Sequence, residues 1–146
     1  MSRLDDILKT GFGWISPKGN VASCKMHEHF KSIRKHRDLS KELKKQFKQM
    51  ENTLYDCEME CQDLEDEYGR GYGEWHNYEL MEDQLRSDMW SALIQAGWVR
   101  FGEWSGNIEF QGIQESLDKH NSIIYIVARE IRKTGCDISF EIREAK

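Results

Sequence analysis

Cys24, His27 and His29 place one thiol and two imidazoles within six residues of the chain. Thiolate sulfur and imidazole nitrogen are the ligands that zinc prefers, and a structural zinc site takes four of them. Cys57 and Cys61 could supply the remainder, but both are also part of an apolar helical stripe described below. Because no second ligand motif of familiar spacing occurs, we predict no metal and no cofactor, and keep a zinc-stabilised protein built on Cys24, His27 and His29 as an alternative.

The same segment could pair Cys24 as a nucleophile with His27 or His29 as its base. Catalytic partners normally come from segments that lie far apart in the sequence. The chain also lacks the glycine-rich phosphate-binding motif, the serine-hydrolase motif and the metalloprotease motif. We therefore name no catalytic residue, and the sequence favours a binding protein over an enzyme.

A basic segment from Lys31 to Lys48 carries eight lysine and arginine residues against two acids. Such a cluster is the sequence feature of a nucleic-acid-binding surface. The next stretch, Glu51 to Glu67, carries eight acids and no base, so an acidic helix could neutralise the cluster instead. The candidate residues for an acidic partner or for nucleic acid are Lys31, Arg34, Lys35, Arg37, Lys41, Lys44, Lys45 and Lys48.

Apolar residues recur at alternating steps of four and three along the same stretch, which is the heptad pattern of a coiled-coil helix. We call these residues the heptad seam: Leu43, Phe47, Met50, Leu54, Cys57, Cys61, Leu64 and Tyr68. A parallel copy would set acid beside acid, whereas an antiparallel copy lays the basic half of one helix along the acidic half of the other. The sequence therefore predicts an antiparallel homodimer that is centred near residue 52, with the seam as its interface.

A second helix is predicted from about Glu74 to Ala96, after a glycine-rich turn at Gly69 to Gly73. The short turn makes this helix an antiparallel neighbour of the first. We expect both this contact within the chain and the contact between copies.

The remaining elements predict an α+β fold. Two hairpins, near residues 14–24 and 98–110, and a C-terminal strand at 137–142 form a small antiparallel sheet with helices on one face. Residues 1–38 and 97–146 make up this domain, and residues 39–96 are an inserted coiled-coil arm that dimerises. Trp104, at the turn of the second hairpin, is a candidate partner-binding aromatic.

The bulk composition indicates a soluble, mildly acidic protein of 146 residues with a net charge of -5. No signal peptide and no apolar run long enough to span a membrane is present, so we expect a cytoplasmic protein without a membrane partner. In that compartment the four cysteines are expected to be thiols.

Two short motifs resemble a scattered group of small phage and prophage proteins. The group has a hairpin of the form W-[IL]-x-P-[DN]-G, then C-x4-H, then a separate G-W-[IV] hairpin. Here the matching residues are Trp14 to Gly19, Cys24 with His29, and Gly97 to Val99, while Lys18 replaces the usual acidic or amide residue and the arm is an insertion. The resemblance implies a phage protein in the bacterial cytosol that inhibits or redirects a host protein, including an anti-defence factor of the anti-CRISPR kind. A small nucleic-acid-binding or transcription-modulating dimer is the alternative.

Overall fold

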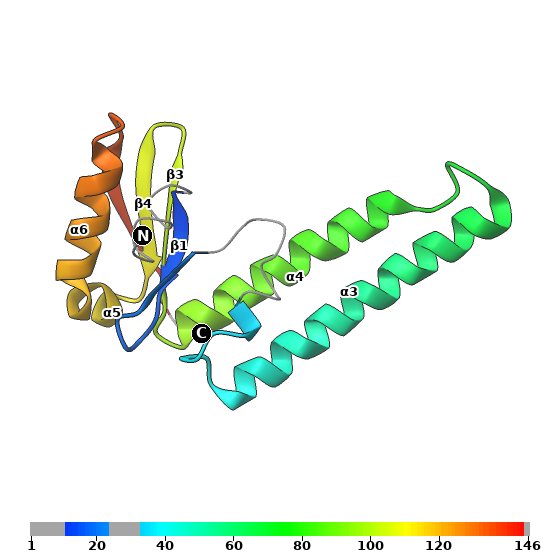
Figure 1. The fold of residues 1–146 in the computed structure, drawn as a ribbon, viewed down its shortest axis with the longest axis horizontal. Coiled ribbons are helices and arrows are strands. Elements are labelled where there is room, and N and C mark those ends of the chain that lie inside the picture. The colour runs from blue at the N-terminus through cyan, green and yellow to red at the C-terminus, as the bar shows by residue number, and fades with distance from the viewer. Residues whose placement is uncertain (1–10, 24–32, 145–146) are drawn as a thin grey trace. The chain divides into compact units, whose positions relative to one another are not determined.

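The computed structural model describes residues 11–23 and 33–144. The elements are β1 (Phe12–Ile15), β2 (Val21–Ser23), α3 (Lys41–Tyr68), α4 (Trp75–Gln95), β3 (Val99–Trp104), β4 (Asn107–Gly112), α5 (Gln114–Lys119), α6 (Asn121–Arg132) and β5 (Asp137–Ile142) (Figure 1). The chain divides into two compact units. The sheet unit comprises residues 11–23 and 91–144, and the arm unit comprises residues 33–90. The predicted α+β class is confirmed.

The five strands form one sheet in the order β2-β1-β3-β4-β5. β1 pairs antiparallel with both β2 and β3, and β3 pairs antiparallel with β4. Both predicted hairpins therefore share a single sheet, joined where Ile15 of β1 lies opposite Val99 of β3.

The last strand corrects one detail of the predicted sheet, because β5 runs parallel to β4 and the sheet is mixed. The helices α5 and α6 lie between these strands in sequence and return the chain to the end of the sheet at which β4 begins. A helical crossover is the usual connection between parallel neighbours, whereas a tight hairpin joins antiparallel ones. The alternating residues 137–142 indicated a strand, but alternation carries no information about direction.

The core of the sheet unit lies between one face of the sheet and the helices α5 and α6. Phe101 and Phe110 are fully buried and lie opposite each other on β3 and β4. α6 faces them with buried residues at the three- and four-residue spacing of an amphipathic helix, namely Ile124, Val127, Ala128 and Ile131. Burial of this apolar surface stabilises the sheet unit.

The arm unit contains α3 and the greater part of α4, which run antiparallel (Figure 1). α3 begins at a cap in which Ser40 Oγ accepts a hydrogen bond from the Leu43 N–H at 3.2 Å. It ends at Gly69, whose φ of 96° is a conformation that favours glycine. No helix in the described residues 11–23 and 33–144 combines the length and the apolar character that crossing a membrane requires.

Candidate functional site

The heptad seam lies along α3, and the chain covers its eight side chains to different degrees. Phe47 and Cys61 are buried within the single chain, whereas Tyr68 is 58% exposed. The half-buried members are Leu43, Met50, Leu54, Cys57 and Leu64. The seam is therefore a partly covered apolar stripe, and six of its residues still present surface to a second helix.

Two hydrogen bonds join α3 to the beginning of α4 at the glycine-rich turn. Trp75 Nε1 donates to Glu65 Oε1 at 2.8 Å, and Cys61 Sγ donates to the carbonyl oxygen of Glu74 at 3.6 Å. Further along α4, burial and then the nearby carboxylate of Glu82 raise the pKa of Tyr78, which keeps its phenol neutral. The antiparallel contact within the chain that the short turn predicted is thus present at this end of the arm.

The cysteines of the seam are suited to packing. Burial raises the pKa of the Cys61 thiol, and the neighbouring Cys57 adds to the shift. A raised pKa keeps the thiol protonated at neutral pH, and a protonated thiol is a poor nucleophile and a poor metal ligand. Cys57, Cys61 and Cys136 are free thiols. Cys61 therefore contributes apolar contact to the arm.

Most of the described part of the basic segment faces water. The exposed members are Lys35, Arg37, Lys41, Lys45 and Lys48, and Lys44 is half-buried. Arg34 is engaged within the arm unit, with its Nε 2.7 Å from Glu51 Oε2. Lys31 lies outside the described residues. The first two turns of α3 thus carry a positive surface that an acidic helix or a phosphate backbone could contact.

Trp104 lies at the end of β3 and packs on the sheet. Its ring makes an edge-to-face contact with Phe12 at 5.3 Å between centroids, and the guanidinium carbon of Arg100 lies 4.5 Å from the ring centroid. A Cβ added at Gly102 would meet the indole carbon Cη2 at 2.3 Å, so the glycine makes room for the ring. Trp104 is half-buried, and its predicted role as a partner-binding aromatic stays a prediction for the part of the ring that remains accessible.

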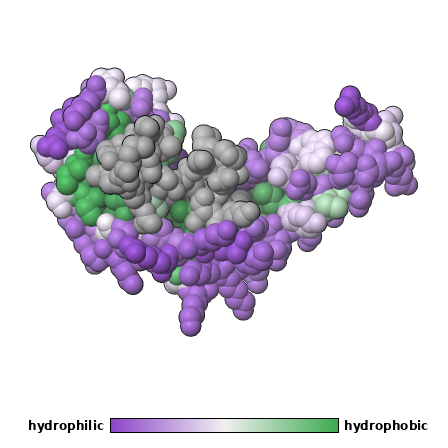
Figure 2. Space-filling view, in the orientation of Figure 1, coloured by the Kyte–Doolittle hydropathy of each residue, from purple (hydrophilic) through white to green (hydrophobic). Residues whose placement is uncertain are grey.

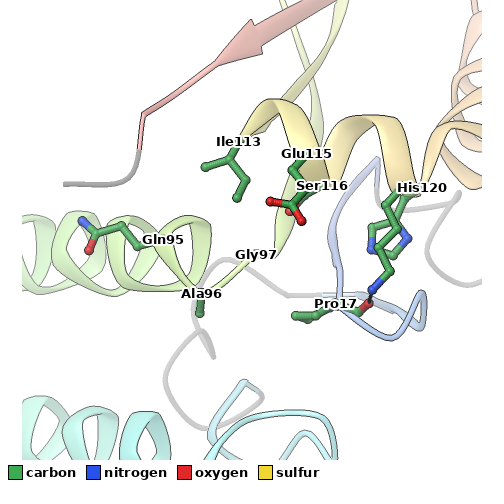
Figure 3. A pocket seen from close by; sticks show the side chains of 9 residues that line it. Pro17, Gln95, Ala96, Gly97, Ile113, Glu115, Ser116 and His120 are labelled. Atoms are coloured by element: carbon green, nitrogen blue, oxygen red, sulfur yellow. Dashed lines mark hydrogen bonds between the residues drawn. The ribbon is translucent and has the colours of Figure 1, made fainter.

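A cavity of about 270 Å³ lies in the sheet unit between the β1–β2 turn, the segment after α4, and α5 (Figure 3). Its polar side chains are Gln95, Glu115, Ser116, Lys119 and His120. Lys119 Nζ donates to the carbonyl oxygen of Pro17 at 2.8 Å, which ties α5 to the turn. We call this cavity the His120 pocket.

His120 places a buried imidazole at the wall of the pocket. The residue is 4% exposed, and its Nε2 has no hydrogen-bond partner among the described residues. Burial, followed by the positive charge of Lys119, lowers the pKa of the imidazole from 6.5, so the ring is neutral at pH 7. A neutral imidazole, the Ser116 hydroxyl and an ammonium group can hydrogen-bond a small polar molecule.

The metal candidates Cys24, His27 and His29 lie outside the described residues. Within residues 11–23 and 33–144, no group of three or more histidine, cysteine or acidic side chains could hold a metal ion. The zinc-stabilised alternative therefore stays a hypothesis about the segment around Cys24.

Sequence reasoning did not identify the His120 pocket or the exposed apolar residues of the sheet unit. Four large apolar residues are more than 40% exposed there, namely Tyr125, Ile126, Phe140 and Ile142. Figure 2 shows apolar side chains gathered on the part of this unit where Figure 1 draws α6. The alternation of residues 137–142 was the available signal for the last two, but it did not indicate that β5 is an edge strand.

Comparison of the chain with protein-family models, with curated proteins and with solved structures found no match in any of the three.

Proposed function

We propose that this protein is a homodimeric binding protein that acts by occupying the surface of another protein, and that the two copies join through α3 of the arm. The observation that carries the proposal is the heptad seam, which the chain itself covers only in part. Phe47 and Cys61 are already buried, so the surface for a copy comes from the half-buried seam residues and Tyr68. Burying the remainder of this stripe would supply the apolar contact that drives association.

The charges along α3 favour antiparallel pairing. Its first two turns carry exposed Lys41, Lys45 and Lys48, whereas every charged residue from Glu51 to Glu67 is an acid. In a pairing centred near residue 52, Lys44 and Lys45 lie beside Glu58 and Glu60 of the copy. Each exposed pair contributes only about 0.2–1 kcal/mol, so apolar contact supplies most of the affinity and the charges select the direction.

The large exposed residues support a role in binding other proteins. The arm unit exposes Tyr55, Met59, Tyr68, Tyr72 and Leu80, each by more than 40%. Exposed aromatic and methionine side chains are typical of protein-binding surfaces. Together with the resemblance of Trp14 to Gly19 to small phage proteins, this surface makes a bacterial host protein the proposed target, with inhibition of a defence protein as one form of that activity.

Charge reversal on the two halves of α3 tests the dimer. Lys44→Glu with Lys45→Glu replaces two of the four lysines of α3 by acids, and Glu58→Lys with Glu60→Lys replaces two of the eight acids between Glu51 and Glu67 by bases. We expect each variant alone to associate roughly tenfold more weakly than the original chain, because like charges then meet twice across the two-fold axis. An equimolar mixture should form a heterodimer, since the substituted residues of each copy again meet opposite charges on the other.

Sedimentation equilibrium from about 1 to about 100 micromolar is the measurement, a range that covers ordinary dimer affinities. Circular dichroism of each variant checks that the helices persist. A mixture that associates no better than its components would contradict the antiparallel arm pairing. Variants that both associate as strongly as the original chain would contradict it as well.

The exposure of Lys35, Arg37, Lys41, Lys45 and Lys48 favours one second candidate, a nucleic-acid-binding dimer. Contacts with phosphates release counterions, so affinity for DNA or RNA would fall steeply as salt rises. An electrophoretic shift that is lost at raised salt and in Lys41→Glu with Lys48→Glu would support this candidate. A shift that persists in that variant would remove the basic segment as its cause.

A further inference from the structure

We propose that β5 is a second self-association surface, at which the edge of the strand that faces away from β4 pairs antiparallel with β5 of another copy. This inference goes beyond the dimer formed by the arm and uses none of its residues. It concerns the sheet unit alone, and it commits to a second copy of this chain as the occupant.

β5 is an edge strand with an exposed surface. Among the strands of the described residues it lies at one end of the sheet order, and five of its six residues are exposed while Ile138 is half-buried. Phe140 and Ile142 are 60% and 58% exposed, although both lie on the face of the sheet that carries the core. Long exposed edges with apolar side chains pair readily with other strands unless they are protected.

The backbone of β5 presents a regular set of hydrogen-bonding groups at this edge. The N–H groups of Asp137 and Arg143 donate to β4, to the carbonyl oxygens of Gly106 at 2.8 Å and Gly112 at 3.0 Å. Alternate residues of a strand direct their backbone groups to opposite sides. The N–H and C=O groups of Ile138, Phe140 and Ile142 therefore point toward the open edge, where an antiparallel strand could bond to them.

The charges of the strand distinguish the three registers that are centred on Ser139, Phe140 and Glu141. Two-fold pairing places one residue opposite itself and its neighbours opposite each other in reverse order. A pairing centred on Ser139 would place Asp137 opposite Glu141 of the copy, and one centred on Glu141 would oppose two glutamates. Centring on Phe140 places Asp137 opposite Arg143 of the copy. Opposite charges across a strand pair are stabilising and like charges are destabilising, so of the registers centred on these three residues the one on Phe140 is favoured.

The same register buries the exposed apolar residues together. It places Phe140 opposite itself and Ile138 opposite Ile142 on the core-side face, where Phe140 already stacks on Phe110 at 5.7 Å. α6 of both copies then lies on this face. Ile123 lies near the β1–β2 turn, since a Cβ added at Gly19 would be 3.3 Å from its Cδ1.

Tyr125 follows Ile123 by two residues and therefore projects from the opposite flank of α6, toward the β5 side. Its side chain is 63% exposed. The paired edges would bring the Tyr125 flanks of the two copies toward each other above Phe140. The contact thus has an apolar centre and a charged pair at each end, which is the arrangement of a specific interface.

Single cysteines test the register. Residues directly opposite each other in a hydrogen-bonded antiparallel pair have Cα atoms about 5.5 Å apart, within the roughly 4.4–6.8 Å that a disulfide spans. We expect Phe140→Cys to form a 140–140 disulfide dimer under mild oxidation. The matched variant Ser139→Cys should give no cross-link beyond the original chain, because Ser139 faces Glu141 of the copy.

Mass-spectrometric mapping of the linked peptides identifies the bond while the native cysteines stay in place. A 139–139 link, or no 140–140 link in a variant whose circular dichroism is unchanged, would overturn the proposed register. The strand pairing as a whole is then decided by association measurements on variants that lack the cross-link.

Those measurements are made in the Lys44→Glu, Lys45→Glu background, in which pairing of the arm is weakened roughly tenfold. We expect this chain still to dimerise, and Arg143→Asp added to it to weaken association roughly tenfold, because Asp137 then meets an acid at both ends of the contact. Asp137→Arg added together with Arg143→Asp exchanges the charges and should restore the dimer. If the Lys44→Glu, Lys45→Glu chain is monomeric at every concentration, the β5 proposal is overturned and the arm dimer stays intact. If the original chain with Arg143→Asp alone is monomeric, the arm dimer is overturned.

Discussion

Replacing Phe47 by alanine separates contacts within the chain from contacts between copies. Phe47 is 0% exposed in the single chain, and Tyr55 on the same helix is 59% exposed. Truncating a buried phenylalanine removes its apolar contacts and leaves a cavity, at a cost of about 3–5 kcal/mol in the free energy of unfolding. Tyr55→Ala is the matched control, and it should change this free energy by less than about 0.5 kcal/mol.

Urea unfolding followed by helical circular dichroism measures both variants, at two protein concentrations that differ roughly a hundredfold. Because the chain itself covers Phe47, its loss should cost the same at both concentrations, whereas an interface residue would show a concentration-dependent cost. Phe47→Leu, with a smaller volume change, provides a folded variant if alanine abolishes folding. Equal losses for Phe47→Ala and Tyr55→Ala, or a Phe47→Ala loss that grows with concentration, would refute the burial of Phe47 within the single chain.

Three further changes follow from individual contacts. Ser40→Ala removes the cap on the Leu43 N–H and should lower the free energy of unfolding by about 0.5–2 kcal/mol in the same urea experiment. Gly13→Ala places a methyl group 2.5 Å from the carbonyl oxygen of Ala22 and should cost about 1–3 kcal/mol and lower the melting temperature. The pKa of His120 is lowered from 6.5 by burial, so the unfolded chain takes up the proton first as pH falls. Stability should therefore decrease from about pH 7 to about pH 5, and His120→Gln should flatten that part of the pH profile.

The helices and strands of this chain were predictable from local sequence pattern, whereas the segments against which they pack were not. The heptad spacing indicates α3 correctly, because it is a property of one helix. The spacing predicts that another helix covers the apolar stripe. A helix of the same chain and a helix of another copy could each cover it. The structure shows Phe47 and Cys61 buried within the chain, which the spacing alone does not distinguish from burial against a copy.

The direction of β5 and the His120 pocket lay beyond local pattern for a similar reason. The pocket joins α5 to a turn about one hundred residues earlier, through the 102-residue separation between Lys119 and Pro17. The hairpin predicted near residues 14–24 contains this turn, but nothing in the sequence places His120 beside it. The hairpin residues likewise predicted strands, while the parallel pairing of β4 with β5 follows only from the crossover of α5 and α6.

The two proposed self-association surfaces together restrict the assemblies that the protein can form. Each surface pairs with the same surface of another copy about a two-fold axis. Each copy can therefore contact two others, one through the arm and one through β5. Two different two-fold contacts produce either a closed ring with an even number of copies or an open filament. A closed trimer is therefore incompatible with this combination. In the proposed contacts apolar burial would hold the arm and backbone hydrogen bonds the β5 edge, so raised salt should weaken neither contact strongly. Disrupting either contact should reduce the assembly to dimers.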